Sequence, residues 1–158
     1  MKNKQNIKEF VICLLIPLVV GVVSSILSMN AMEEFNTLNK PPLAPPAWLF
    51  PVVWTILYIL MGISSYLILI SDASKEDIQK ALDTYLFQLF FNFGWSIIFF
   101  NFGWRLFAFA WLAAMWALIL KLLNQYKVIS KPAFYMMIPY IIWVTFAGYL
   151  NLGFFLLN

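Results

Sequence analysis

Three sets of side chains recur at helical spacing in apolar parts of the chain, and their types suit ligand binding better than acid–base chemistry. In the first set, Trp54, Tyr58 and Met61 are spaced i, i+4, i+7, so they share one face of a helix. Indole and phenol rings stack well on flat, mostly apolar molecules. This face predicts the wall of a ligand pocket. The alternative is that these aromatic residues only anchor a helix near a membrane surface.

The other two sets mix amide, aromatic and small side chains. They are Gln88, Asn92, Trp95 and Phe99 in one stretch, and Tyr140, Trp143, Ala147 and Asn151 in another. Polar groups inside a bilayer are costly unless they are paired. Gln88 and Asn151 are therefore candidates for hydrogen bonds between helices. Asn92 is suited to either task, pairing between helices or lining the pocket.

The residues that are missing exclude several kinds of chemistry. The chain has no histidine, which removes imidazole bases, histidine zinc sites and a proximal histidine for haem iron. The single Cys13 cannot form a disulfide within the chain. No acidic residue or lysine lies deep in an apolar segment, which argues against an ion-coupled transporter. We expect no metal site, no required cofactor and no nucleic-acid partner.

The composition indicates an all-α membrane protein. Hydrophobic residues make up 63% of the chain and charged residues 11%, whereas soluble domains carry roughly 25% charged residues. The charges are also segregated, and the stretches between them approach the ~20 residues that cross a bilayer. We expect one membrane domain over residues 1–158, a bundle of five transmembrane helices. Their expected ranges are about 10–29, 48–70, 81–100, 106–123 and 132–157.

Two connecting segments carry further signals. Residues 30–46 form a mixed polar and apolar loop whose prolines, Pro41 to Pro46, exclude helix and favour an extended, stiff chain. Trp48 follows at the position of an interfacial aromatic residue. We expect this loop to cover the pocket. Ser74 and Asp77 form a capping-box-like pair at the start of the third long helix.

The positive charges set the expected orientation. Lys40 and Arg105 fall on one side of the membrane. The N-terminal tail and the two connections on the other side carry Lys2, Lys4, Lys8, Lys75, Lys80, Lys121, Lys127 and Lys131. Cytoplasmic loops of membrane proteins are enriched in Lys and Arg. We therefore expect a multi-pass protein of the cell membrane. Its N-terminus is cytoplasmic, and the C-terminus and the proline-rich loop face outward.

The chain resembles the TspO/MBR family, the bacterial relatives of the translocator protein once called the peripheral benzodiazepine receptor. The residues that carry the resemblance lie in four segments in the right order. They are Lys40-Pro41, Pro45-Pro46, Trp48, Val53-Trp54-Thr55, Leu57-Tyr58 and Met61-Gly62; Gln88-Leu89, Asn92 and Trp95; Arg105; and Pro139-Tyr140, Trp143, Phe146-Ala147 and Leu150-Asn151.

The resemblance implies a five-helix bundle, commonly a homodimer, with a pocket under the first loop. It implies binding of porphyrins such as protoporphyrin IX, and of synthetic isoquinoline carboxamide and benzodiazepine ligands. The ligand-binding positions that it implies are Trp48, Trp54, Tyr58, Asn92, Trp95, Trp143, Ala147 and Leu150. Some bacterial members are similar in promoting light-dependent porphyrin breakdown, and Trp54 and Trp143 match the tryptophans linked to that chemistry. A facilitated transporter of tetrapyrroles or other hydrophobic ligands is the alternative.

Two departures and one assembly expectation complete the prediction. Leu43 stands where the family often has another tryptophan. Nothing basic follows Lys131, so the weak cholesterol motif of the animal proteins has no counterpart near Tyr149. Small residues that allow close helix contact are candidates for the homodimer interface. They form two pairs, Gly21 with Ser25 and Ala110 with Ala114.

Overall fold

The computed structural model describes residues 7–158, and within this range every regular element is helical. The six α-helices are α1 (Ile7–Leu27), α2 (Ala31–Thr37), α3 (Leu49–Leu69), α4 (Lys75–Ser96), α5 (Arg105–Ile129) and α6 (Lys131–Leu157). A π-helical segment, η1 (Ile97–Asn101), continues α4. The expected all-helical fold class is confirmed.

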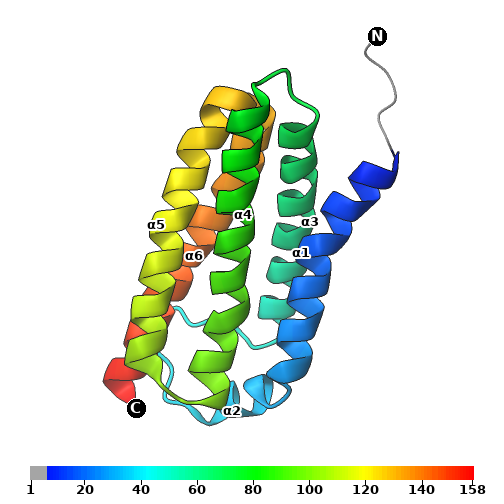
Figure 1. The fold of residues 1–158 in the computed structure, drawn as a ribbon. Helices are drawn as coiled ribbons and strands as arrows, with labels where there is room; N and C mark the ends of the chain where they lie inside the picture. Colours follow the sequence, from blue (N-terminus) through cyan, green and yellow to red (C-terminus); the bar gives the residue numbers. More distant parts are fainter. Residues whose placement is uncertain (1–6) are drawn as a thin grey trace.

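The five long helices run alternately in opposite directions, and the short α2 lies across one end of the bundle (Figure 1). We call this end, where α1 and α6 finish, the α2 end. The helices α1, α3, α5 and α6 are long and apolar enough to cross a membrane. By the same measure α4 falls short, because its first turns carry Lys75, Glu76, Asp77, Lys80 and Asp83. Lys2 and Lys4, which enter the orientation argument, lie outside the described residues.

Side-chain caps explain where two of the long helices start. The Ser74 hydroxyl accepts a hydrogen bond from the Asp77 backbone N–H at 3.1 Å and donates to the Asp77 carboxylate at 2.7 Å. The expected capping pair is therefore confirmed, and it starts α4 at Lys75, well before the expected residue 81. Ser130 caps α6 by accepting from the Ala133 backbone N–H. The helix α5 extends to Ile129, six residues past the expected end at 123.

The segment expected to be an extended loop contains a helix and a turn. Residues 31–37 form α2, whose Phe35 is buried and packs against Phe50 and Phe154. A turn follows, closed by a hydrogen bond from the Ala44 N–H to the Pro41 carbonyl. Leu43 occupies the left-handed position of this turn, with φ of 67°, a conformation that usually selects glycine. The chain is therefore stiff here but not extended.

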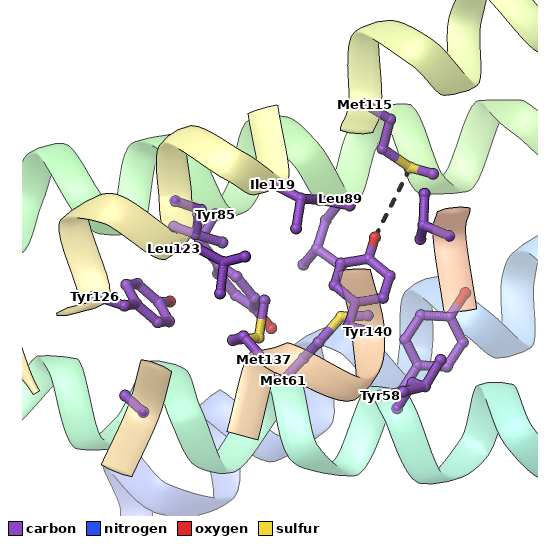
Figure 2. Packing of buried hydrophobic residues seen from close by; sticks show 14 of the residues in the cluster. Tyr58, Met61, Tyr85, Leu89, Met115, Ile119, Leu123, Tyr126, Met137 and Tyr140 are labelled. Carbon is purple, nitrogen blue, oxygen red and sulfur yellow. Dashed lines mark hydrogen bonds between the residues drawn. The ribbon is translucent and has the colours of Figure 1, made fainter. Parts of the chain in front are cut away.

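The interior of the bundle has two differently packed parts. The larger part is a close-packed core away from α2. It includes Met61, Ile68, Met115, Ile119, Leu122, Tyr126 and Met137. Figure 2 shows several of these side chains together with Tyr85 and Tyr140. The smaller part lies at the α2 end and is rich in aromatic rings, among them Phe35, Phe99 and Phe154. The candidate site occupies this second part.

Candidate ligand-binding site

A cavity of about 800 Å³ lies under α2, with walls from α1, α2, α3, α4 with η1, and α6. Six of the eight residues expected to bind a ligand line it, namely Trp54, Tyr58, Asn92, Trp95, Ala147 and Leu150. The structure thus brings together residues that are up to 96 positions apart in the sequence. The volume of the cavity falls within the roughly 300–1,000 Å³ typical of small-molecule sites.

The other two expected residues lie outside the lining. Trp48 is 63% exposed at the start of α3. Trp143 meets Phe50 edge-on, with ring centroids 5.8 Å apart. Phe50 lines the cavity and Trp143 does not, so Trp143 contacts a lining residue rather than the cavity space. The Trp143 indole N–H is buried and has no hydrogen-bond partner.

Stacked aromatic rings form one wall of the cavity. Trp54 and Tyr58 stack with centroids 5.7 Å apart, and Trp54 also meets Tyr140 edge-on at 6.3 Å. Trp54 and Tyr58 of the predicted face therefore lie in this wall, whereas Met61 lies in the close-packed core. Trp95 lies against Phe99 on another wall, at 5.5 Å. These rings offer flat apolar surfaces on more than one side of the space.

A buried chain of hydrogen bonds fixes the polar groups below these rings. The Tyr58 hydroxyl donates to the Asn92 side-chain oxygen at 2.7 Å, and the Asn92 amide donates to the Tyr140 hydroxyl at 3.0 Å. Tyr140 in turn donates to the Gln88 side-chain oxygen at 2.6 Å. Three helices are thereby tied together. Asn92 performs both tasks considered for it, since it pairs between helices and lines the cavity.

A second chain of contacts links the cavity to α2. The Trp95 indole N–H donates to the Asn151 side-chain oxygen at 3.0 Å, and the Asn151 amide donates to the Arg105 carbonyl at 2.8 Å. The Arg105 guanidinium forms a partly buried ion pair with Glu34 of α2, at 2.9 Å. Ala31, Met32 and Phe35 of α2 line the cavity. The hydrogen bond to Asn151 therefore orients Trp95, and the ion pair between Arg105 and Glu34 helps to hold α2 over the cavity.

The proline segment is held in place by contacts with α6 and the C-terminal residue. The Tyr149 hydroxyl donates to the Pro42 carbonyl at 2.8 Å. The side chain of Asn158 both accepts from the Asn39 N–H and donates to the Asn39 carbonyl, at 2.9 and 3.0 Å. Pro41 packs directly on Gly153, where a Cβ atom would come within 2.6 Å of it. This side of the loop is held onto α6, while α2 forms the cover.

A patch of serines beside the cavity was missed by the sequence reasoning. Ser24 of α1 and Ser28, directly after the end of α1, both reach Ser96 of α4, at 2.6 and 3.4 Å. All three line the cavity. Their i, i+4 spacing was the available signal. Gly21, expected to allow contact between subunits, instead allows close approach of Tyr58, because a Cβ at this position would overlap the phenol ring.

The lining of the cavity contains no charged side chain. Within residues 7–158, no group of three His, Cys, Asp or Glu residues is placed to hold a metal ion. The site therefore offers ring surfaces, hydroxyl groups and amide groups. Such a set is suited to noncovalent binding of a largely apolar, flat molecule with a few polar atoms.

The chain is similar to known proteins over most of its length. The model of the TspO/MBR family matches residues 13–157. The tryptophan-rich protein TspO of Chlorobaculum tepidum is 36% identical over 157 residues, which cover 99% of each chain. The tryptophan-rich protein TspO of Archaeoglobus fulgidus is 33% identical, over 97% of this chain and 99% of its own. The translocator protein of Ovis aries is 34% identical, over 74% of this chain and 70% of its own. The chain is therefore a membrane protein of the TspO/MBR family.

Proposed function

We propose that the protein binds porphyrins of the protoporphyrin IX type in the cavity under α2. The observation that carries this proposal is the arrangement of Trp54, Tyr58, Trp95 and Phe99 around an uncharged space of about 800 Å³. A flat macrocycle gains contact area from rings on several sides. Synthetic isoquinoline carboxamide and benzodiazepine ligands also carry aromatic rings, which are suited to the same ring surfaces.

Titration of the protein with protoporphyrin IX in lipid nanodiscs, in the dark, tests the binding proposal. We expect a saturable change in the porphyrin absorbance at one site per chain. Trp95→Ala removes a ring from the wall and should weaken binding about tenfold or more, the range of an aromatic hot spot. Trp116→Ala is the control, because that ring is partly exposed on α5 and lies outside the cavity. Equal affinities for both variants would contradict the proposed site.

Light-dependent breakdown of the bound porphyrin is the second candidate activity, favoured by the position of Trp54 in the wall. Dissolved dioxygen is the oxidant, the macrocycle is the reductant, and the excited porphyrin is the sensitiser. An indole in contact with the macrocycle can donate an electron to the excited porphyrin, which passes it to dioxygen, and the oxidised indole then regains an electron from the macrocycle. Trp143 contacts Phe50 and lies outside the cavity lining. Trp54→Phe should slow bleaching per bound porphyrin more than Trp143→Phe does. If both variants bleach as fast as the unchanged protein, the tryptophans act only as wall surface.

The proposal includes five membrane spans, with α4 as the fifth, and a cytoplasmic N-terminus. Cysteines at positions 3 and 158, introduced one at a time in a Cys13→Ser background, should react with impermeant reagents from opposite sides of the membrane. Labelling from one side would rule out five spans.

A homodimer is also part of the proposal. Of the two pairs expected at its interface, Gly21 and Ser25 line the cavity, whereas Ala110 and Ala114 are exposed on α5. A monomeric mass in nanodiscs would contradict the dimer.

A further inference from the structure

Two positive charges stand at the same end of the bundle as α2. They are Lys40 and Arg105, whereas the other Lys and Arg residues of the described part lie at the opposite end, on the first turns of α1, α4 and α6 and toward the end of α5 (Figure 1). Glu33 and Glu34 of α2 balance them. The α2 end of the cavity therefore lies near two cations whose charges are balanced by two carboxylates.

Each of these two cations lies against a ring that lines the cavity. The Lys40 ammonium is 4.9 Å from the centroid of Phe35, and the Arg105 guanidinium carbon is 5.8 Å from the centroid of Phe99. Phe35 and Phe99 both line the cavity and both contact Phe154. The two positive charges are thus one ring away from the uncharged space, on the side of the cavity nearest α2.

The bonding of Arg105 is incomplete. Its Nη2 donates to Glu34 at 2.9 Å, while its Nε is buried and has no partner. A guanidinium carries five donors in a planar fork that matches a carboxylate through two parallel hydrogen bonds. A buried donor without an acceptor is unfavourable. The Nε donor of Arg105 therefore has no acceptor among the described residues, and it is enclosed, because Arg105 is not part of the cavity lining.

We propose that the ligand of this cavity carries carboxylate groups, and that Arg105, assisted by Lys40, binds them at the α2 end. The inference rests on the proposed function and names the residues that recognise the acidic part of the ligand. The ring of the ligand occupies the uncharged space, and a carboxylate reaches the Nε of Arg105 once the Phe99 ring that separates them turns aside. Glu34 competes with that carboxylate for the same guanidinium.

This competition predicts opposite changes in ligand affinity for two variants, and that difference distinguishes ligand recognition from structural support of α2. If the ion pair only holds α2 in place, Arg105→Gln and Glu34→Gln remove the same contact and must weaken binding alike. If Arg105 binds a ligand carboxylate, Arg105→Gln weakens binding, while Glu34→Gln strengthens it by removing the competitor. The effect must also depend on the charge of the ligand.

The experiment compares protoporphyrin IX, which has two carboxylates, with its uncharged dimethyl ester. Both are titrated in the dark against the full chain in zwitterionic phosphatidylcholine nanodiscs, with absorbance as the readout and empty nanodiscs as the blank. The variants are Arg105→Gln, Arg105→Lys, Lys40→Gln and Glu34→Gln. Lys121→Gln, at the opposite end, is the control. Thermal unfolding of each variant is recorded so that affinities are compared among folded proteins.

We expect the unchanged protein to bind the acid more tightly than the ester. Arg105→Gln should weaken binding of the acid about tenfold, as for loss of a hydrogen bond to a charged group, and leave the ester unaffected. Arg105→Lys, which keeps the charge but loses the fork, should lie between them. Lys40→Gln should weaken the acid by a few-fold, because Lys40 is exposed, and Glu34→Gln should tighten it by a few-fold.

Two outcomes overturn the inference. One is equal binding of acid and ester by the unchanged protein, which leaves porphyrin binding intact and removes the carboxylate site. The other is a parallel loss of both ligands in Arg105→Gln and Glu34→Gln, which reduces the ion pair to a support for α2. A different result, no saturable binding of either ligand, would instead refute the proposed function itself.

Discussion

The core and the α2 end are built from the same long helices, yet side chains fill the core and leave a cavity at the α2 end. In the core, thioether and aliphatic side chains such as Met61, Met115, Met137 and Ile119 are fully buried (Figure 2). At the α2 end, rigid rings meet mostly edge-on, as Phe35 does with Phe50 and Phe154. Flexible methionines fill irregular gaps, whereas rings that brace one another keep the helices apart. The cavity is therefore a product of the side chains that surround it.

The two regions also differ in how their buried hydroxyl groups are paired. Tyr58 and Tyr140, beside the cavity, donate to Asn92 and Gln88. The hydroxyls of Tyr85 and Tyr126, in the core, are buried near Ser65 and Ser64 but form no hydrogen bond of usual length and angle with them. Paired groups hold a site in one geometry before the ligand arrives, which lowers the ordering cost of binding. The hydrogen-bonded tyrosine hydroxyls therefore lie beside the cavity, where a ligand would bind.

The largest expected difference between the two regions is in the stability lost when a methionine is shortened. Met137 is fully buried in the core, so Met137→Ala should lower the free energy of unfolding by about 2–5 kcal/mol, the range for large-to-small changes that leave a void. Met32→Ala, the same change in the partly exposed cavity wall, should cost well below that range. Unfolding in a denaturing detergent titration gives both values. Similar losses would mean that the α2 end is packed as tightly as the core.

A smaller effect is expected from removing single hydroxyl groups. Tyr58→Phe leaves the Asn92 side-chain oxygen without its donor and should cost about 1–3 kcal/mol. Tyr85→Phe removes a buried hydroxyl that has no partner and should be neutral or stabilising. The same unfolding measurement applies to both. A destabilised Tyr85→Phe protein would show that its hydroxyl is paired, for example through an internal water.

The smallest expected change concerns the shape of the cavity. Gly21→Ala places a methyl group where the Tyr58 ring lies, so the ring must move and its bond to Asn92 must lengthen. We expect porphyrin affinity to fall by up to about tenfold, equivalent to about 1.4 kcal/mol, with a modest change in stability. Val19→Ile, on the exposed side of α1, is the control. Unchanged affinity for Gly21→Ala would mean that Tyr58 is not part of the binding surface.

Much of the fold followed from the segregation of charge, because uncharged apolar stretches of this length have few alternatives to helix in a membrane. The pairing of Asn151 and of the Gln88 side-chain oxygen between helices followed from the cost of an unpaired amide, although the Gln88 amide nitrogen is buried without a partner. The short helix α2 did not, since seven residues lack the length for intrinsic helix stability. It depends on the burial of Phe35 among rings from α3 and α6, which are distant in sequence.

The site was predicted in part for a geometric reason. At 100° per residue, Trp143 lies about 60° from Tyr140 and Leu150 about 80° on the same side, so the helix angle alone does not separate them. Leu150 lines the cavity, whereas Trp143 contacts Phe50 and lies outside the lining. A stripe drawn on one helix does not specify which part of it a neighbouring helix covers. The exclusion of Trp143 from the lining therefore required the position of α3.

The uneven placement of the seven tryptophans has a consequence for fluorescence. Trp54 and Trp95 line the cavity, and the other five lie outside the lining. A colourless ligand, which cannot accept excitation energy from distant indoles, should change the emission of these two and leave the remainder as a constant background. Proteins carrying Trp54→Phe or Trp95→Phe would then divide the signal between two known positions. The difference would report on which wall a colourless ligand lies against.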